Sequence, residues 1–380
     1  MHFLPSFFVP REHYLRVYWQ IRIAIALIGL ALAIMARRPI ARSVAQNPAG
    51  ALTTLLSIGV AFGVSELILR QRPFRAAEEV PARSEPARRL DPQLGWTFIP
   101  SRVGYQRSKA VGITDYAFDR NGYRVRRVNE PVDLDRPTMI FTGESMMVGE
   151  RLAWKDTIPA RTEQMTGIQS ANIAVSGYAT DQAYLRLKSD IARFRTPIAV
   201  VMLFSPSIFD RNLDDDRPHL MSGLQWHPPA RRWRLAALAR RVVRYRSAET
   251  IERGIATTRE VLRATLDLAR SRGAVPVILV PQFGQELPRE TELRHRILDE
   301  PGLPYLWLHI DPRWRVPDDG HPDARAAHAM AEAIAGRLAA GVEHAGAGSH
   351  EIPSNRAPLL DGHRMPSRAS SVAGVLAVRR

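Results

Sequence analysis

Cysteine is absent from this 380-residue chain. The absence excludes disulfide bonds, thiolate metal sites and a cysteine nucleophile. It does not decide the compartment, because a protein without disulfides can work on either side of a membrane.

Lysine is almost absent as well, since only Lys109, Lys155 and Lys188 stand among the 53 basic residues. Arginine therefore carries the formal net charge of +15, and we attribute its excess first to the codon bias of a GC-rich genome. The arginines are scattered, and no nucleic-acid-binding motif accompanies them. We expect no nucleic-acid partner, and we expect the charge to favour anionic lipid headgroups instead.

Two long apolar runs open the sequence, Val17–Met35 and Ala49–Leu69. Each is long enough to cross a bilayer, and Glu66 is the single carboxylate of the second. A cleaved signal peptide fits poorly, because the first run begins far into the chain and the second follows at once. We predict a multi-pass membrane anchor of two transmembrane helices over residues 1–75, with membrane lipids as partners. The alternative is a buried hairpin of a soluble protein.

Charge counting gives one indication of orientation. The segment between the runs holds Arg37, Arg38 and Arg42, whereas five arginines flank the outer ends of the two runs. Because arginine is enriched on the cytoplasmic side, this count favours a cytoplasmic location for the rest of the chain.

Composition divides the remainder into three parts. Residues 76–89 are rich in Ala, Glu, Pro and Arg, which is typical of a linker. Residues 90–340 have the texture of one globular domain. Residues 341–380 contain Gly, Ala, Ser, Pro and Arg without periodicity, so we predict a disordered tail.

The domain shows two patterns. Aromatic residues spaced between turn signals, which include Gly104, predict short strands and a hairpin over Leu90–Arg126. Apolar strands then alternate with amphipathic helices, and this alternation predicts an α/β fold with a parallel sheet covered on both faces. The strands are expected at Thr138–Thr142, Ile168–Val175, Ile198–Phe204, Val275–Val280 and Tyr305–Ile310. The helices are expected at Thr157–Met165, Tyr184–Phe194, Ala248–Arg272 and Ala327–Leu338.

Three polar clusters fall where strands end or where the last helix begins, the edge at which such sheets bind ligands. The first is Thr142-Gly143-Glu144-Ser145, which puts a serine on a tight strand-to-helix turn. The second runs from Asn172 to Tyr178 and contains Gly177. The third is Asp318-Asp319-Gly320-His321. Each cluster alone is equally typical of an ordinary turn or an exposed loop.

The third cluster suits acid–base chemistry. Asp318 lies three residues before His321, so its carboxylate can bind one ring nitrogen and fix the tautomer. The other nitrogen is then free to take a proton from Ser145. His219, His227, His295 and His309 have no comparable neighbours.

Taken in order, the clusters resemble those of the SGNH or GDSL-type hydrolases over about Asp91 to Ala340. Gly143-Glu144-Ser145 matches the family's Gly-Asp-Ser block with Glu in place of Asp, and Gly177 matches the second-block glycine. Asp318 to His321 matches the family's Asp-x-x-His block. Asp119 to Arg124 resembles the stretch that precedes the serine in membrane-anchored bacterial members. The resemblance implies a flavodoxin-like three-layer fold and a catalytic triad of Ser145, Asp318 and His321, with no metal and no cofactor.

One departure concerns the oxyanion hole. The family has an asparagine in its third block, whereas Ser207 stands at that place here. The resemblance therefore implies Gly177 and Ser207 as oxyanion donors beside the N–H of Ser145. Losing one good donor lowers the rate about 100- to 1000-fold. Asn212 is a conceivable substitute for the missing amide.

These features predict a hydrolase of acyl esters, and we expect the acyl group to be short, such as acetate. An O-acyltransferase would use the same site, and a catalytically weakened domain that binds a glycan or lipid is the alternative. By resemblance, the substrate is an acylated polysaccharide and the catalytic domain is extracytoplasmic, which opposes the arginine count.

The segment Asp210 to Arg246 interrupts the α/β pattern and ends in a basic amphipathic stretch, Arg231 to Tyr245. It is either a helix that covers the rim of the site or a helix that lies on anionic headgroups.

Overall fold

The central sheet of the computed structural model has eight strands, in the order β12-β11-β8-β6-β7-β5-β4-β3. The model describes residues 18–71, 85–230, 233–242 and 246–346. Strands β6, β7, β8, β11 and β12 are parallel, and β3, β4 and β5 extend the sheet antiparallel beyond β7. The strands are β3 (Arg102–Ser108), β4 (Gly112–Phe118), β5 (Arg124–Val125), β6 (Thr138–Thr142), β7 (Gln169–Asn172), β8 (Pro197–Leu203), β11 (Val275–Phe283) and β12 (Leu306–Ile310).

The parallel strands occupy the buried middle of the domain. Every residue of β6 and β7 is buried, and so is most of β8 and β11. The Val, Ile, Leu, Met and Phe residues of β6, β8 and β11 are what a sheet covered on both faces requires, whereas β7 has the sequence Gln-Ser-Ala-Asn. All five strands expected from the sequence are present, within a few residues at their ends.

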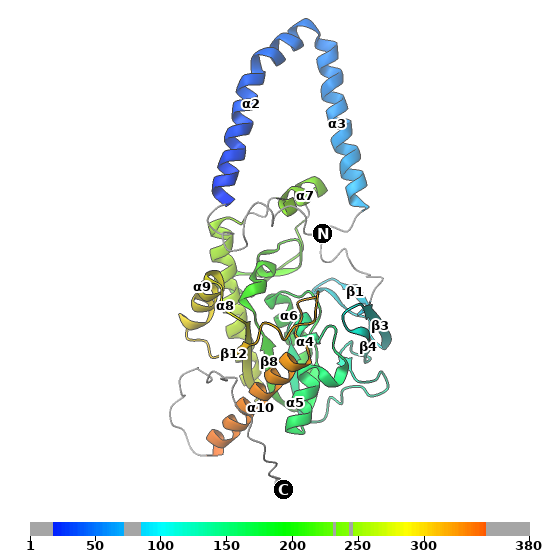
Figure 1. Cartoon of the computed structure of the whole chain (residues 1–380), viewed down its shortest axis with the longest axis vertical. Helices are drawn as coiled ribbons and strands as arrows, with labels where there is room; N and C mark the ends of the chain where they lie inside the picture. Colours follow the sequence, from blue (N-terminus) through cyan, green and yellow to red (C-terminus); the bar gives the residue numbers. More distant parts are fainter. Residues whose placement is uncertain (1–17, 72–84, 231–232, 243–245, 347–380) are drawn as a thin grey trace.

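Helices cover the sheet in two pairs. Helix α5 (Ile158–Thr166) packs against α10 (Ala324–Gly346), and α6 (Thr180–Asp190) packs against α8 (Ala248–Ser271). Figure 1 shows α5 and α10 together in front of the strands. The predicted α/β class and the predicted layering are confirmed.

The predicted strands and hairpin over Leu90–Arg126 are also present. Strands β1 (Arg88–Asp91) and β2 (Gly95–Phe98) form a small antiparallel ribbon, and β3 and β4 form the hairpin. The prediction of a turn at Gly104 was wrong, because Gly104 lies inside β3, opposite Tyr116. The turn lies between the two strands, at residues 109–111.

Shorter elements complete the domain. They are α4 (Ser145–Val148), α7 (Arg234–Val242), α9 (Pro288–Arg294), β9 (His219–Met221), β10 (Gln225–His227), the 3-10 segments Trp154–Asp156, Ile191–Arg193, Pro206–Leu213 and Ser222–Leu224, and a π-helical turn at His295–Asp299.

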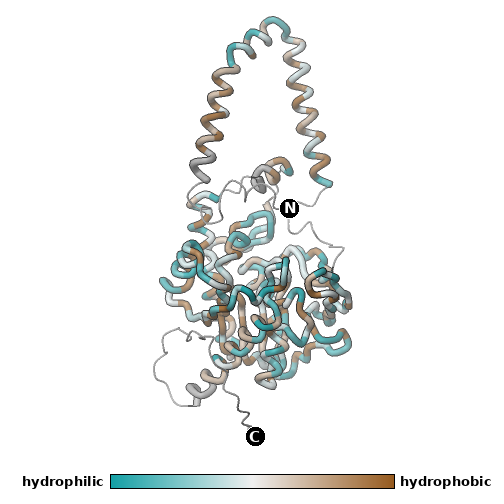
Figure 2. The backbone as a smooth tube through the Cα atoms, viewed as in Figure 1, coloured by the Kyte–Doolittle hydropathy of each residue, from teal (hydrophilic) through white to brown (hydrophobic). Residues whose placement is uncertain are grey.

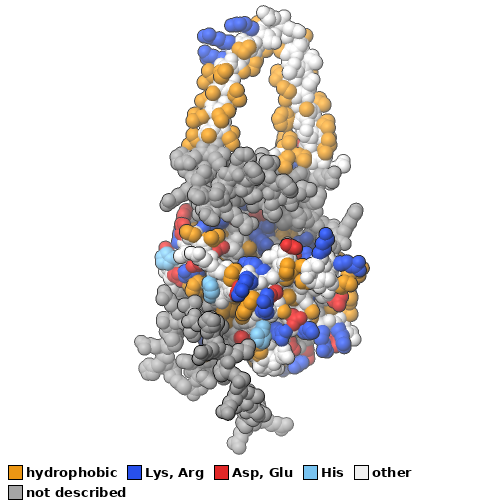
Figure 3. All heavy atoms as spheres, in the orientation of Figure 1, with side chains coloured by type: hydrophobic (Ala, Val, Ile, Leu, Met, Phe, Trp, Pro, Cys, Tyr) orange, Lys and Arg blue, Asp and Glu red, His pale blue; other side chains and the backbone are white. Residues whose placement is uncertain are grey.

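Two long helices project from one end of the domain (Figure 1). They are α2 (Tyr18–Gln46) and α3 (Pro48–Arg70), and their apolar side chains are exposed along the hairpin, as Figures 2 and 3 show. Both are long and apolar enough to cross a membrane. The segment between the two apolar runs, with its three arginines, forms the last part of α2, and Asn47 alone separates the helices.

Helix α7 connects this hairpin to the domain. The carboxylate of Glu66, near the end of α3, accepts hydrogen bonds from the backbone N–H groups of Arg234 (2.9 Å) and Leu235 (3.1 Å). Those groups lie in the first turn of α7, where backbone donors lack helical partners. The carboxylate also pairs with Arg70, so Glu66 connects the hairpin to a segment of the domain 168 residues away.

Two boundary predictions fall partly outside the described residues. The predicted linker 76–89 lies outside them up to residue 84, and its last residues begin the fold, because β1 starts at Arg88. The predicted disordered tail lies outside them from residue 347 on, and its first residues, 341–346, form the end of α10.

Candidate active site

Ser145 lies at the carboxyl end of β6, on a turn that its neighbours hold. Gly143 has a φ of 147°, and a Cβ there would lie 3.3 Å from side-chain atoms of Leu203 and Met147, which explains the glycine. Glu144 caps α4, because its carboxylate accepts from the backbone N–H of Met146 at 3.1 Å. The turn therefore fixes Ser145 as the first residue of α4.

His321 comes from the loop between β12 and α10, and the fold brings it to Ser145 across 176 positions of the sequence. Its Nε2 lies 2.9 Å from Ser145 Oγ. Ser145 is buried with 5% of its surface exposed, whereas His321 is half-buried. The two predicted residues are thus in hydrogen-bond contact.

The carboxylate at the other ring nitrogen belongs to Asp319. Asp319 Oδ1 makes a short hydrogen bond with His321 Nδ1. Asp318, which the sequence pattern assigned to this place, is exposed and has a φ of 60°. Its left-handed backbone conformation belongs to the tight turn before His321. The structure therefore brings together Ser145, His321 and Asp319, and it leaves Asp318 outside the group.

Arg151 holds the second oxygen of Asp319. Its Nε donates to Asp319 Oδ2 at 2.7 Å, and both side chains are mostly buried. Burial acts to raise the pKa of Asp319, but the hydrogen bonds and charges of His321 and Arg151 outweigh it and lower that pKa. The carboxylate is therefore ionised wherever His321 could act as a base.

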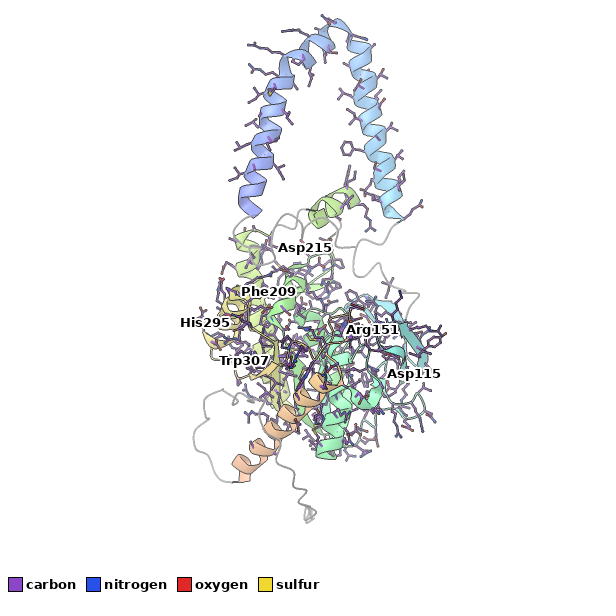
Figure 4. The ribbon with its side chains drawn as sticks, viewed as in Figure 1. Asp115, Arg151, Phe209, Asp215, His295 and Trp307 are labelled. Atoms are coloured by element: carbon purple, nitrogen blue, oxygen red, sulfur yellow. The ribbon has the colours of Figure 1, made fainter. Side chains whose placement is uncertain are left out.

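The loop that carries Arg151, labelled in Figure 4, follows α4 directly. Arg124 stabilises this loop, because its buried guanidinium donates hydrogen bonds to the carbonyl oxygens of Val148, Gly149 and Leu152 at 2.6 to 2.7 Å. Burial lowers the pKa of Arg124 to about 10. Arg151 itself has a φ of 67°, a conformation that side chains other than glycine rarely adopt. The loop is therefore held in a specific shape beside the serine.

Two further carboxylates surround the serine and histidine. Glu150 Oε2 lies 3.3 Å from His321 Nε2. Glu144 Oε2 accepts the hydroxyl hydrogen of Ser145 at 2.5 Å and is bound in turn by Arg211 Nη1 at 3.1 Å. The serine hydroxyl therefore has two acceptors in this structure, Glu144 and His321.

A cavity of about 800 Å³ opens onto these residues. Its walls come from the ends of β6, β8 and β11, the 3-10 segment Pro206–Leu213, α9 and the loop of His321. Polar side chains such as Gln282, Gln285 and Glu290 line it together with Phe283 and Leu287. A volume of this size accepts a substrate larger than an acetyl group.

The two expected oxyanion donors lie in different places. Ser207 lines the cavity, and its hydroxyl is 2.8 Å from that of Ser205. Gly177 is not among the lining residues, and its φ of 80° serves the turn beside Trp96. Asn212 is used elsewhere, because its amide bonds to Thr180 and Thr258.

The arrangement is equipped for nucleophilic catalysis. An imidazole with a carboxylate on Nδ1 carries its proton there, so Nε2 can accept the serine proton. Among the described residues, no group of three or more His, Asp and Glu side chains could hold a metal ion.

No protein-family model matches the chain, and no curated protein matches it either. Among solved structures, it is similar to one described as a lipolytic protein of the G-D-S-L family from Desulfitobacterium hafniense. The identity is 13%, with 53% of this chain and 98% of that chain covered and a TM-score of 0.35.

It is also similar to an acetyl xylan esterase from the rumen bacterium Butyrivibrio proteoclasticus, with 10% identity over 56% of this chain and 66% of that one and a TM-score of 0.35. A salicylyl-acyltransferase from a tetracycline biosynthetic pathway shares 15% identity over 56% and 57% of the two chains, with a TM-score of 0.30.

Sequence reasoning missed four residues of the site. Asp319 had a signal, since it is an acid directly beside the one chosen. Glu150 and Arg151 follow the serine block and match no pattern. Arg211 lies in the segment where an amide was sought, and a search for a cation there would have found it.

Proposed function

We propose that this chain is a serine hydrolase that cleaves acyl esters with Ser145 as nucleophile and His321 as base. The observation that carries the proposal is the 2.9 Å contact between Ser145 Oγ and His321 Nε2, with a carboxylate on Nδ1. That geometry is the one a hydroxyl needs to lose its proton as it attacks.

The reaction has two halves. His321 Nε2 takes the hydroxyl proton while Ser145 Oγ bonds to the ester carbon, and the carbonyl electron pair moves onto its oxygen. The intermediate collapses, the carbon–alcohol oxygen bond breaks, and His321 gives its proton to the leaving alcohol. Water then attacks the acyl-serine by the same steps and releases the carboxylic acid. Asp319 orients the imidazole and stabilises its cation.

Asp319 rather than Asp318 is the acid in this proposal, because the Asp319 carboxylate is the one that contacts Nδ1 of the ring. For the oxyanion, Ser207 is the better placed of the two donors that the resemblance implies, since it lines the cavity and Gly177 does not.

The experiment is turnover by the full chain in detergent on nitrophenyl esters of increasing acyl length, beside Ser145→Ala and His321→Ala. We expect turnover that both variants lose, because each removes one partner of the catalytic pair. Equal rates in the wild type and both variants, with all three proteins folded, would contradict the proposal and favour a binding domain.

The alcohol portion of the ester is proposed to be a polysaccharide that carries short acyl groups. The cavity supports this, because amide and carboxylate side chains next to an aromatic ring suit a hydroxylated ligand. If a sugar hydroxyl replaces water in the second half-reaction, the product is a transferred acyl group. Appearance of acyl-oligosaccharide in place of free acid would identify that outcome.

We further propose that α2 and α3 anchor the domain at the outer face of a cytoplasmic membrane. Their length and exposed apolar side chains support the spans. The proposal places the arginines near the end of α2, Arg37, Arg38 and Arg42, in the cytoplasm, because they lie toward the hairpin tip farthest from the domain (Figure 3). It rests on the family resemblance and not on the arginine count, which favours the opposite orientation.

A further inference from the structure

We infer that Arg211 is a catalytic residue that binds the carbonyl oxygen of the ester as it becomes negatively charged. The inference rests on the proposed hydrolysis at Ser145. It assigns an electrostatic role to a side chain that neither the sequence motifs nor the triad includes.

The first argument is distance. One carboxylate oxygen, Glu144 Oε2, separates the guanidinium from the nucleophile, since it lies 2.5 Å from Ser145 Oγ and 3.1 Å from Arg211 Nη1. The carbonyl oxygen of an attacked ester is two bonds from Ser145 Oγ. It therefore forms within the reach of a guanidinium placed this close.

The second argument is that Arg211 has donors to spare. Among the described residues, its hydrogen bonds leave from Nη1 alone, to Glu144 and to the carbonyl oxygen of Tyr178. Nε and the second terminal nitrogen make no hydrogen bond to those residues, and Arg211 lines the cavity with 32% of its side chain exposed. An arginine offers five N–H donors in a fixed plane, so it can hold Glu144 and a second oxygen at once.

The third argument is the shortage of other donors at this place. The Ser207 hydroxyl lies 2.8 Å from Ser205 Oγ and has one hydrogen to give. Gly177 does not line the cavity. A developing oxyanion needs donors fixed in advance around it, and Arg211 is a cation already fixed beside the nucleophile.

Glu144 completes the argument about charge. Before substrate binds, Glu144 Oε2 holds both the serine hydroxyl and Arg211. When the serine proton passes to His321, the hydrogen bond from Ser145 to Glu144 breaks while the ion pair stays. Glu144 thus keeps the guanidinium in place, and the Arg211–Glu144 ion pair is neutral as a whole. The new negative charge forms near the N–H groups of Arg211 that Glu144 does not use.

The test is a double-mutant cycle on the full chain in detergent, with Arg211→Gln, Glu144→Gln and the pair. Arg211→Lys is the conservative variant, and Arg313→Gln is the control because Arg313 is exposed and, within the described part of the chain, forms its ion pair with Asp311 alone. Each protein is assayed for kcat and KM on nitrophenyl acetate and for inhibition by phenylboronic acid, which forms an anionic tetrahedral adduct on serine. Thermal unfolding checks that each variant folds.

We expect Arg211→Gln to lower kcat about 100-fold or more with little change in KM. Boronate inhibition should weaken by a similar factor, and Arg211→Lys should recover part of both losses. The loss should persist in the Glu144→Gln background, because the cation acts on the substrate and not only on Glu144.

Two results would overturn the inference while leaving the hydrolase intact. One is an active wild type with an equally active Arg211→Gln. The other is a loss that disappears in the Glu144→Gln background, which would make Arg211 only a brace for Glu144. A wild type no faster than Ser145→Ala would instead overturn the proposed function and this inference together.

Discussion

At the scale of single residues, the acid beside His321 decides how the site works. Asp319 contacts Nδ1, and Arg151 holds its other oxygen at 2.7 Å. Asp318 lies next to it in sequence and points elsewhere, because the turn gives it a left-handed backbone.

Asp319→Asn is therefore expected to lower kcat by about 10⁴-fold, since an amide at that place favours the wrong tautomer of His321. Asp318→Asn should keep activity close to the wild type. Steady-state turnover of both variants on nitrophenyl acetate checks this. The reverse ranking would restore the assignment made from the Asp-x-x-His spacing.

Asp319 also predicts a dependence of stability on pH. Its pKa is lower in the folded protein than in the unfolded chain, so the unfolded chain binds more protons between the two values. The carboxylate thus adds stability above its unfolded pKa of about 3.9, and this contribution disappears as pH falls through the folded value.

The midpoint of thermal unfolding, measured from pH 7 down to pH 2, should be higher for the wild type than for Asp319→Asn at neutral pH. The difference should shrink below about pH 4. A difference that stays constant across that range would show that the ionised carboxylate is not what stabilises the loop.

Motifs in a fixed order pointed to two residues that the fold brings into contact, whereas the residues selected by distance in space were missed. Ser145 and His321 meet as their motifs indicate. The choice between Asp318 and Asp319 depends on one positive φ in a turn. Arg211 lies near Ser145 because the 3-10 segment Pro206–Leu213 follows β8 along the edge of the site. Neither can be read from spacing.

At the scale of elements, the loop after α4 depends on one buried cation. Arg124 donates to three carbonyl oxygens of that loop and lies at the start of β5, so it ties the serine turn to the antiparallel extension of the sheet.

Arg124→Met should lower the free energy of unfolding by about 3 kcal/mol or more, because hydrogen bonds to a charged group contribute about 1.5–3 kcal/mol each and the carbonyls would stay buried. Denaturant unfolding followed by tryptophan fluorescence measures it. Arg126→Met, at a largely exposed arginine two residues on, is the control. Equal losses in both variants would argue against a special role for the buried network.

The contact between Glu66 and α7 is the second stabilising interaction between elements. Glu66→Ala removes the acceptor for the N–H groups of Arg234 and Leu235. Since a helix cap contributes about 1 kcal/mol, hydrogen exchange at these two amides should speed up several-fold. Mass spectrometry of the exchanged protein checks it, with Glu130→Ala as the control because Glu130 pairs with Arg126 and Arg127 instead. Unchanged exchange would mean that α7 is held in another way.

The elements were the most predictable level. Apolar runs predicted most of the parallel strands, because burial on both faces leaves a nearly continuous pattern, and β7 is the polar exception with Gln-Ser-Ala-Asn. Gly104 was misplaced because glycine marks turns more often than strand interiors. The contact between α3 and α7 could not be predicted, since it joins positions 168 apart through a single carboxylate.

At the scale of the whole molecule, an apolar hairpin stands at one end and the α/β domain at the other (Figures 1 and 2). The exposed apolar side chains of α2 and α3 are the surface that the proposed membrane anchor would place in lipid. Alkaline phosphatase becomes active only after export from the cytoplasm. Because the domain is proposed to lie outside the cytoplasmic membrane, the phosphatase fused after Ala340 is expected to be active in a bacterial host. A silent phosphatase, together with an active cytoplasmic reporter at the same site, would place the domain in the cytoplasm.

The most direct test of the central claim is covalent labelling of the intact chain with a fluorophosphonate, read by mass spectrometry. We predict one adduct, on Ser145, which is abolished in Ser145→Ala and strongly slowed in His321→Ala, because the hydroxyl then lacks its base. A folded wild type that takes no label, or that is labelled at another serine, would contradict the account of Ser145 and His321 as a catalytic pair.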